Sequence, residues 1–281
     1  MKVLVIGSGG REHALTFSIS KSNKVKKIYC IPGNAGTSSL AENISIDINN
    51  FETVYEFLKK NNIDFVVVGP EDPLVNGIVD YLEKLGIKIF GPNKIASQLE
   101  GSKIFTKKMC EKYNIPTAKF GIFKNIEETK KFIEKTKYPI VIKADGLASG
   151  KGVLIIDNKN EAKRELKEML LNSKFGEASK MVVIEEFLSG TELSCFIFTD
   201  GKGYVTLPFA KDYKKIGEND KGLNTGGMGA VSPVPFVSMD FERKIHERII
   251  KPTMKGIIDG NLEYKGFIFI GLIKVGENPY V

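Results

Sequence analysis

The chain has 281 residues, 42% hydrophobic and 27% charged, a composition that is typical of globular proteins and excludes disordered, collagen-like and membrane-spanning classes. At this length about two domains are expected. The 41 basic and 34 acidic residues leave a net charge of +7, which favours anionic partners. Most basic residues are lysines scattered among acids, so the sequence favours small anions over nucleic acids.

Cysteines and apolar runs indicate the compartment. Cys30, Cys110 and Cys195 are far apart and odd in number, so they predict free thiols in a reducing environment. The first residues lack the apolar run of a signal peptide, and the longest apolar stretch, 266–273, is far too short to span a membrane. We therefore expect a cytoplasmic protein with no membrane partner.

The first hundred residues alternate short β-branched runs with amphipathic segments. Strands are expected at 2–6, 26–31, 64–69 and 87–90, with helices beginning near Arg11 and Phe51 and a third at 74–84. Strands separated by helices form βαβ units with a parallel sheet. The sequence thus predicts a Rossmann-like α/β domain over residues 1–101.

The remainder has a different, α+β pattern. After a helical connection at 102–115, strands are expected at 119–123, 139–144, 152–156 and 181–187, with helices at 127–135 and 160–171. Beyond these, the pattern predicts strands at 192–198 and 203–209, a long loop at 211–228, a helix at 239–258 and a strand at 267–275. Gly276 to Pro279 predicts a turn into a returning strand at Tyr280, so we expect the chain to stop within a hairpin, short of its full fold.

The segment GSGGREHA, Gly7 to Ala14, lies between a strand and a helix, where backbone N–H groups and the helix dipole attract anions. It differs from the dinucleotide fingerprint, because Glu12 stands at the third glycine and the second strand lacks the acid that would bind a ribose. A tight turn alone would also explain the glycines. Arg11 favours a bound monophosphate.

The segment PEDPLVNG, Pro70 to Gly77, follows the third strand of this domain. Ligands of parallel sheets bind at the carboxyl ends of the strands, so Glu71 and Asp72 are expected to face the same crevice as Gly7 to Ala14. Acids there could accept hydrogen bonds from sugar hydroxyls or an amine. They could equally do no more than favour the N-terminus of a helix.

Lys143 ends the apolar strand PIVIKA, and Lys151 lies in the glycine-rich loop that follows. The Walker A spacing is not met, because Asp145 replaces its first glycine and Gly152 its Ser or Thr. A strand-end lysine beside a glycine turn is the alternative, but two lysines around three glycines favour phosphate binding.

Two further segments could bind a nucleotide or an anion. VVIEEFLSGTELS, 182–194, has two acids after an apolar strand and a short connection, which suits an adenine hinge or any strand boundary. The long loop 212–233 includes NTGGMGA, whose backbone amides could bind anions. The sequence has two histidines, His13 and His246, so zinc clusters and Ser/His triads have no support.

Seven segments, taken in order, resemble the phosphoribosylamine-glycine ligase family of purine biosynthesis over nearly the whole chain: GSGGREHA, PEDPLVNG, LEGSKIFTKKM, PTAKF, VIKADGLASGKGV, VIEEFLSGTELS and GLNTGGMGAVSP. The resemblance implies a Rossmann-like domain at 1–101, a helical connection at 102–115, an ATP-grasp lid at 116–189 and an incomplete ATP-grasp central domain at 190–281. It also implies ATP-dependent ligation of glycine to 5-phosphoribosylamine through a glycyl phosphate, giving glycinamide ribonucleotide, ADP and phosphate.

The resemblance also assigns site residues. Those implied to be catalytic are Lys143, Asp212 and Lys215. Those implied to bind ATP are Lys103, Lys143, Gly150, Lys151, Gly152, Glu185, Phe187, Leu188 and Glu192. Those implied to bind phosphoribosylamine or glycine are Gly9, Gly10, Arg11, Glu71, Asp212, Asn224, Thr225, Gly226, Gly227 and Met228.

Some positions depart from the family's usual pattern. Tyr213 and Lys215 stand in a segment that usually reads Asp-His-Lys-Arg, and Leu223 replaces a usual proline. Mg²⁺ or Mn²⁺ is expected for the complete enzyme, but the family's metal ligands would follow Val281, so none is expected in this chain. Two alternatives stay open: another ATP-grasp carboxylate-amine ligase, and a nucleotide-binding fragment without turnover.

Overall fold

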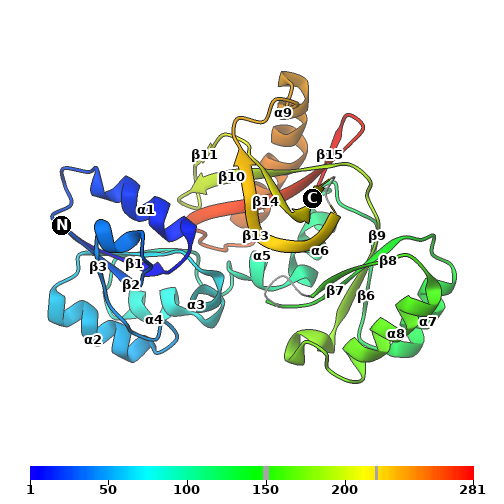
Figure 1. Ribbon diagram of the computed structural model, residues 1–281, viewed down its shortest axis with the longest axis horizontal. Coiled ribbons are helices and arrows are strands. Elements are labelled where there is room, and N and C mark those ends of the chain that lie inside the picture. The colour runs from blue at the N-terminus through cyan, green and yellow to red at the C-terminus, as the bar shows by residue number, and fades with distance from the viewer. Residues whose placement is uncertain (148–151, 219–220) are drawn as a thin grey trace. The chain divides into compact units, whose positions relative to one another are not determined.

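The computed structural model describes residues 1–147, 152–218 and 221–281 (Figure 1). They form two compact units. The first unit comprises residues 1–98 and 262–266, and the second comprises residues 99–261 and 267–281. The predicted division of the second unit into a lid and a central domain stays a prediction. None of the helices in the described residues is long and apolar enough to cross a membrane.

The first unit is built on a five-stranded parallel sheet in the order β3-β2-β1-β4-β5. Its strands are β1 (Lys2–Gly7), β2 (Lys27–Pro32), β3 (Glu42–Asn43), β4 (Phe65–Val68) and β5 (Ile89–Phe90). Its helices are α1 (Gly10–Ser20), α2 (Phe51–Asn61), α3 (Glu71–Asn76) and α4 (Ile78–Lys84), with a 3₁₀ turn at Thr37–Ser39. The Rossmann-like α/β prediction is therefore confirmed.

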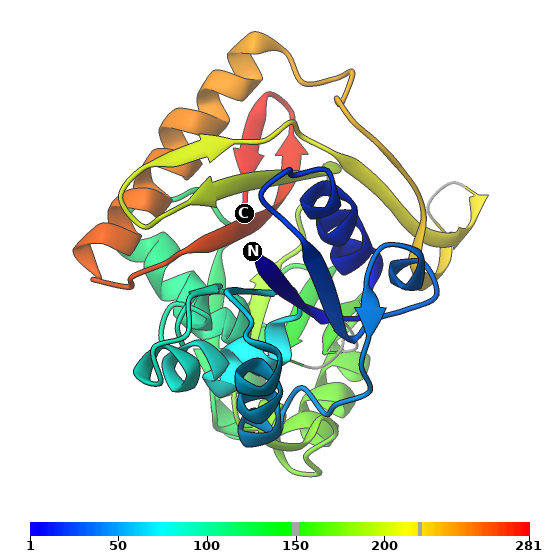
Figure 2. The same cartoon turned by 90° about the vertical axis from the view of Figure 1, so that its left-hand side faces the viewer.

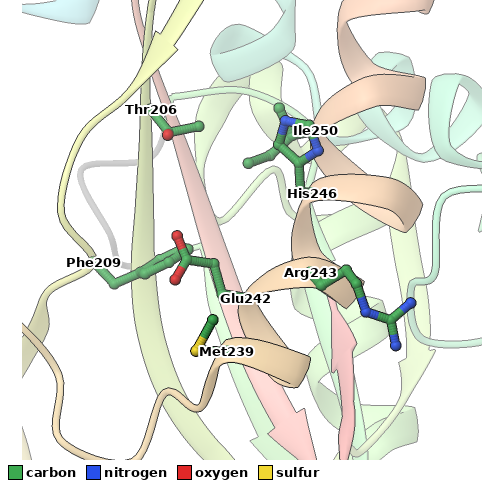
Figure 3. Close-up of a pocket in the computed structure, with 7 residues that line it drawn as sticks. All are labelled: Thr206, Phe209, Met239, Glu242, Arg243, His246 and Ile250. Carbon is green, nitrogen blue, oxygen red and sulfur yellow. The ribbon is translucent and has the colours of Figure 1, made fainter.

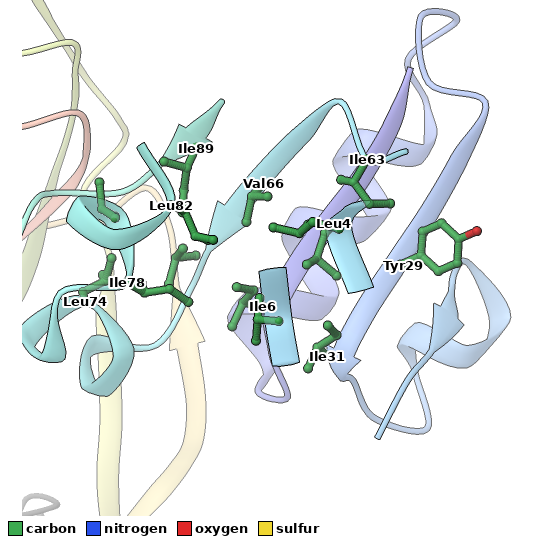
Figure 4. Packing of buried hydrophobic residues seen from close by; sticks show 14 residues of the cluster. Leu4, Ile6, Tyr29, Ile31, Ile63, Val66, Leu74, Ile78, Leu82 and Ile89 are labelled. Atoms are coloured by element: carbon green, nitrogen blue, oxygen red, sulfur yellow. The ribbon is translucent and has the colours of Figure 1, made fainter. Parts of the chain in front are cut away.

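The apolar runs of the sequence explain why this sheet is parallel and central. β1 is buried along almost its whole length, as expected of a strand covered by helices on both faces. Leu4 and Ile6 pack with Leu58 of α2 and Leu82 of α4 in one core cluster (Figure 4). This core fixes the carboxyl ends of β1, β2 and β4, where the glycine-rich loops begin.

The helix predicted at 74–84 is wrong in its bounds. The structure has two helices, α3 and α4, which meet at Gly77. Gly77 has φ of +97°, a left-handed conformation that favours glycine and ends α3. At its other end, α3 begins at Glu71, immediately after the loop that follows β4.

The second unit contains an antiparallel sheet in the order β6-β9-β7-β8, covered by two helices. The strands are β6 (Phe120–Phe123), β7 (Ile140–Ala144), β8 (Val153–Ile156) and β9 (Val182–Glu186). The helices α7 (Ile126–Glu134) and α8 (Lys159–Leu170) lie beside these strands (Figure 1). Their residues Ile133 and Leu166 are buried in one core cluster with residues of the sheet. Before this sheet run α5 (Gln98–Gly101) and α6 (Lys103–Lys112), and a 3₁₀ turn spans Gly176–Lys180.

A second sheet of this unit has the order β11-β10-β14-β15. Its strands are β10 (Thr191–Thr199), β11 (Tyr204–Thr206), β14 (Gly266–Val275) and β15 (Asn278–Tyr280). Beside it lie α9 (Met239–Ile245), a π-helical turn (His246–Ile250) and α10 (Lys251–Asp259), as Figures 1 and 2 both show. The predicted returning strand is confirmed, because β15 pairs with β14, but the turn is shorter than predicted: it comprises Gly276 and Glu277, and the strand already begins at Asn278.

The loop predicted at 211–228 is wrong for the described part of this range. Residues 211–217 form β12 (Lys211–Gly217) and residues 221–231 form β13 (Lys221–Val231), which pair antiparallel. Glycines suggested a loop, but backbone hydrogen bonds need no side chain, and the pairing shifts register twice, as in a bulged hairpin. Gly222 and Gly227 have φ of +86° and +126°, which the irregular strand accommodates because glycine lacks a Cβ.

Candidate active site

The first predicted site lies where the loops of the first unit meet. The amide of Gly33, after β2, donates to the carbonyl of Gly7 at 3.1 Å, and the amide of Gly69, after β4, donates to the carbonyl of Ile6 at 3.0 Å. Three strand ends are thus joined by backbone hydrogen bonds. This is the edge at which parallel sheets bind ligands.

Glu12 explains how the loop tolerates the loss of the third fingerprint glycine. Its carboxylate is buried, and its Oε2 accepts from the amide of Gly9 at 2.6 Å. A Cβ at Gly69 would lie 1.9 Å from Oε1 of Glu12, so the glutamate fills space that glycines leave open. The Gly9 amide therefore donates within the loop, and its contact to a substrate stays a prediction.

Arg11 and Glu71 come together as the sequence predicted. Nη2 of Arg11 lies 3.7 Å from Oε2 of Glu71, with 61% and 44% of the side chains exposed. Nη1 of Arg11 also donates to the carbonyl of Gly69. Beside them, Gly10 has no atom within 4 Å of an added Cβ. The exposed guanidinium stands next to open space at the strand ends, which suits an anion.

The second predicted site is a cluster of lysines in the second unit. Lys143, in β7, and Glu185, in β9, approach to 2.9 Å between Nζ and the carboxylate. Nζ of Lys103, at the start of α6, donates to the carbonyl of Gly146 at 2.9 Å. Predicted ATP residues from three elements thus converge at the end of β7.

Asp145 ties the glycine-rich loop to α6. Its Oδ1 accepts from the hydroxyl of Ser102 at 2.9 Å and from the amide of Ile104 at 3.1 Å. A carboxylate at the first turn of a helix is favoured by the unpaired amides there. This cap brings Lys103 next to the strand-end loop.

Lys107 belongs to the cluster, and the sequence analysis missed it. Its Nζ lies 3.1 Å from Oε2 of Glu185, and the two side chains are 8% and 5% exposed. Its spacing of four residues from Lys103 places both lysines on the same face of α6, but this spacing does not show that the face meets a buried carboxylate.

Burial changes the acidity of these lysines. It lowers the pKa of Lys103 below the ordinary value of 10.5, and the nearby charge of Lys143 lowers it further, against the opposing effect of Asp145. Burial likewise lowers the pKa of Lys107, although Glu185 opposes this. The site thus holds ammonium groups that are poorly hydrated and strongly attract an anion.

The predicted adenine hinge connects β9 to β10. Phe187 is 40% exposed, and a Cβ at Gly190 would lie 2.2 Å from the carbonyl oxygen of Lys274, so only glycine fits this close approach. Glu192 is the second residue of β10 and has an exposed side chain. Gly152 is described, and its carbonyl accepts from the amide of Ala144 at 2.8 Å. The predicted ATP residues Gly150 and Lys151 lie outside the described residues.

Lys214 connects the predicted substrate residues of the β12–β13 hairpin to Glu192, which follows the hinge. Its Nζ is 3.4 Å from Asp212 and 3.8 Å from Glu192. Thr225 donates to the carbonyl of Lys214 at 2.9 Å and accepts from the amide of Gly227 at 3.0 Å. Lys215 stands opposite Asn224 in the β12–β13 register, followed along β13 by Gly226 and the exposed Met228.

A pocket of about 290 Å³ lies elsewhere in the second unit. Phe209 and Ile250 give it an apolar wall, with Glu242, Arg243 and His246 beside them (Figure 3). None of the predicted site residues lines it. Within the described ranges, no three His, Cys, Asp or Glu residues are grouped as metal ligands would be.

Comparison with known proteins decides the family. Residues 1–100 match the phosphoribosylglycinamide synthetase N domain, and residues 101–281 match the phosphoribosylglycinamide synthetase ATP-grasp (A) domain. The chain belongs to the phosphoribosylamine-glycine ligase family. The fold predicted from the resemblance, a Rossmann-like domain followed by an ATP-grasp region, is thereby confirmed.

Individual relatives agree. The phosphoribosylamine-glycine ligase of Caldanaerobacter subterraneus subsp. tengcongensis is 48% identical over the whole chain, which covers 67% of that protein. The crystal structure of the Thermotoga maritima phosphoribosylamine-glycine ligase superposes with a TM-score of 0.86 at 35% identity, covering 100% of this chain and 67% of the other. A D-alanine–D-alanine ligase from Bacillus anthracis, complexed with ATP, shares the fold at 21% identity and a TM-score of 0.64. The chain thus spans about two thirds of the length of its family relatives.

Proposed function

We propose that the chain binds ATP at the lysine cluster of the second unit and contributes to joining glycine to 5-phosphoribosylamine. The observation that carries this proposal is the convergence of Lys103 and Lys143 at the end of β7, beside Glu185 and the hinge at Phe187 and Leu188. Membership of the ligase family supplies the reaction.

The cluster fits a nucleotide. Lys103 and Lys143 bring two positive charges to one edge of the sheet, which suits a triphosphate. Oε1 of Glu185 is buried and lacks a hydrogen bond of good geometry, although Nζ of Lys143 is 2.9 Å away. An exocyclic amine such as that of adenine would supply the missing donor.

In the proposed reaction, a carboxylate oxygen of glycine attacks the γ-phosphate of ATP, forming an acyl phosphate and releasing ADP. The amine of 5-phosphoribosylamine then attacks the acyl carbon, forming the amide and releasing phosphate and a proton. Neither step needs a protein nucleophile. Lysine charges would stabilise the transferring phosphoryl group, and positioning would supply much of the rate.

For the first unit, we propose that Arg11, Glu71 and the start of α1 bind the sugar phosphate or the amine. The exposed guanidinium beside open space at Gly10 supports an anion there. Asp212, Lys215 and the Asn224 to Met228 segment are proposed to bind glycine or phosphoribosylamine, and Glu192 to bind the ribose of ATP.

Mg²⁺ is the metal expected with ATP in such ligases, and it requires a near-octahedral set of oxygen ligands. The described residues do not gather a set of carboxylates to hold it.

The test is phosphate release from ATP in the presence of glycine, phosphoribosylamine or both, with the amide product identified by mass spectrometry. We expect ATP to bind and release to depend on both substrates. Equal release with neither substrate, or with another carboxylate in place of glycine, would contradict the glycine reaction and favour a different carboxylate-amine ligase. ATP binding without release would favour a nucleotide-binding chain without turnover.

A further inference from the structure

Lys107 is a buried charged residue to which the proposed reaction assigns no role. It lies on α6, one helical turn after Lys103, and points its ammonium group into the unit rather than toward solvent. Only 8% of its side chain is exposed, against 26% for Lys143. A buried lysine is costly unless a partner compensates its charge.

Lys107 is held on several sides. Its Nζ donates to Oγ1 of Thr117 at 2.6 Å and lies 3.1 Å from Oε2 of Glu185. Thr117 in turn donates to the carbonyl of Val281 at 2.6 Å, and the ring of Phe120 lies 5.5 Å from the ammonium group. These contacts fix Lys107 beside Glu185, whereas the more exposed Lys143 can turn toward a ligand.

The charges of the cluster give Lys107 a function. Lys107, Lys143 and Glu185 together carry a net charge of +1 when all are ionised. Without Lys107, the remaining pair of Lys143 and Glu185 would be neutral. Of these three residues, Lys143 alone would then balance the charge of Glu185. A lysine that is committed to a buried carboxylate is less able to bind phosphate.

We propose that Lys107 is a positioning residue; this inference rests on the proposed ATP site. Lys107 acts as a permanent counter-ion of Glu185 and so leaves the Lys143 ammonium free to bind the triphosphate of ATP.

Inorganic tripolyphosphate is the probe, because it reads the phosphate subsite without the adenine contact of Glu185. We expect Lys107→Met to weaken tripolyphosphate binding about tenfold or more. This is the effect of losing one charge-assisted contact, here the contact of Lys143 with the phosphate. Lys108→Met is the matched control, since Lys108 is exposed on the same helix, and it should change the affinity less than about twofold.

A second substitution separates positioning from folding. The double variant Lys107→Met with Glu185→Gln restores the net charge of +1, so it should recover most of the lost tripolyphosphate affinity. Glu185→Gln alone raises the net charge to +2 and should tighten binding. A merely structural role for Lys107 predicts no such rescue.

The outcomes are distinct. Equal affinity in the Lys107→Met and Lys108→Met variants, or a double variant as weak as Lys107→Met, would overturn the positioning role while ATP binding by the unsubstituted chain upheld the proposed function. If Lys107→Met does not fold, as checked by circular dichroism, a Glu185→Gln variant that binds tripolyphosphate no more tightly than the unsubstituted chain would overturn it. An unsubstituted chain that binds neither ATP nor tripolyphosphate would overturn both proposals.

Discussion

The two candidate binding regions are built by opposite means. In the first unit, the strand ends are joined by backbone hydrogen bonds, Glu12 fills the turn, and the charged pair Arg11 and Glu71 is largely exposed. In the second unit, Lys103, Lys107 and Glu185 are buried or partly buried charges. The first region depends on close backbone packing and the second on electrostatics in a poorly solvated site.

This difference determines what a substitution should change. In the first unit, a methyl group added at a glycine that packs against Glu12 should lower folding stability, because the glutamate side chain already occupies the space that the glycine leaves. In the second unit, loss of one ammonium group should change ligand affinity. Folding stability and ligand affinity, measured separately for variants of each region, therefore test this difference.

The largest effect is expected at Gly7. Its φ of +126° is strained for alanine, and a Cβ there would lie 2.5 Å from Cγ of the buried Glu12 and 2.9 Å from Cδ of Pro70. We expect Gly7→Ala to lower the free energy of unfolding by at least about 2 kcal/mol, measured by urea denaturation. Gly10→Ala is the matched control and should be neutral or stabilising, since Gly10 begins a helix beside open space. Equal losses in the two variants would show that packing around Glu12 does not limit the turn.

Lys143→Ala should weaken ATP binding by about 1.5 to 3 kcal/mol, the range for a hydrogen bond to a charged group. The reason is that, of the two lysines that contact Glu185, Lys143 is more exposed than Lys107 and can turn toward a phosphate. Calorimetric titration measures the effect, with Lys108→Ala on the exposed side of α6 as control. Unchanged ATP affinity would remove Lys143 from the site.

Alkaline pH should weaken phosphate binding at the lysine cluster of the second unit. Burial lowers the pKa of Lys103 and Lys107, so both lose their protons below 10.5, before lysines of the unfolded chain. In that window the unfolded chain binds more protons, so these lysines make folding more favourable as pH rises, while phosphate affinity falls. Tripolyphosphate titrations between neutral pH and about pH 10 should show the fall.

Lys103→Arg provides the control for this pH dependence, because a guanidinium stays protonated throughout the range. The alkaline loss of tripolyphosphate affinity should be smaller in this variant. An identical pH profile would show that Lys103 does not contribute to it.

The smallest effect is expected for the exposed pair of the first unit. Glu71→Gln removes an ion pair with 3.7 Å separation whose side chains are 61% and 44% exposed, so the free energy of unfolding should change by less than about 0.5 kcal/mol. Denaturation at low and high salt measures this. A salt-sensitive loss of several times that size would mean that charge, and not backbone packing, stabilises the first region.

The sequence predicted the fold well where apolar periodicity was strong. The parallel order of the first unit followed from buried strands such as β1, and the meeting of Arg11 with Glu71 followed from the rule for strand ends. The hairpin at Lys211 to Val231 was not predicted, because its glycine-rich strands pair through the backbone and show no apolar alternation.

The candidate site was predicted only in part from the residues themselves. Lys143 could be found beside a glycine-rich loop, but Lys107 could not, because a lysine within a helix has the same sequence pattern whether it faces solvent or a buried carboxylate. Only tertiary packing places it 3.1 Å from Glu185. The cap that Asp145 gives to α6 likewise joins residues 41 positions apart.

ATP binding at the lysine cluster of the second unit can be tested by a crystal structure of the chain with a non-hydrolysable ATP analogue. We expect triphosphate oxygens within hydrogen-bonding distance of Nζ of Lys103 and Nζ of Lys143, with the base against the Glu185 to Leu188 segment. A nucleotide bound instead at the Gly7 to Ala14 turn of the first unit, with the lysine cluster unchanged, would contradict it.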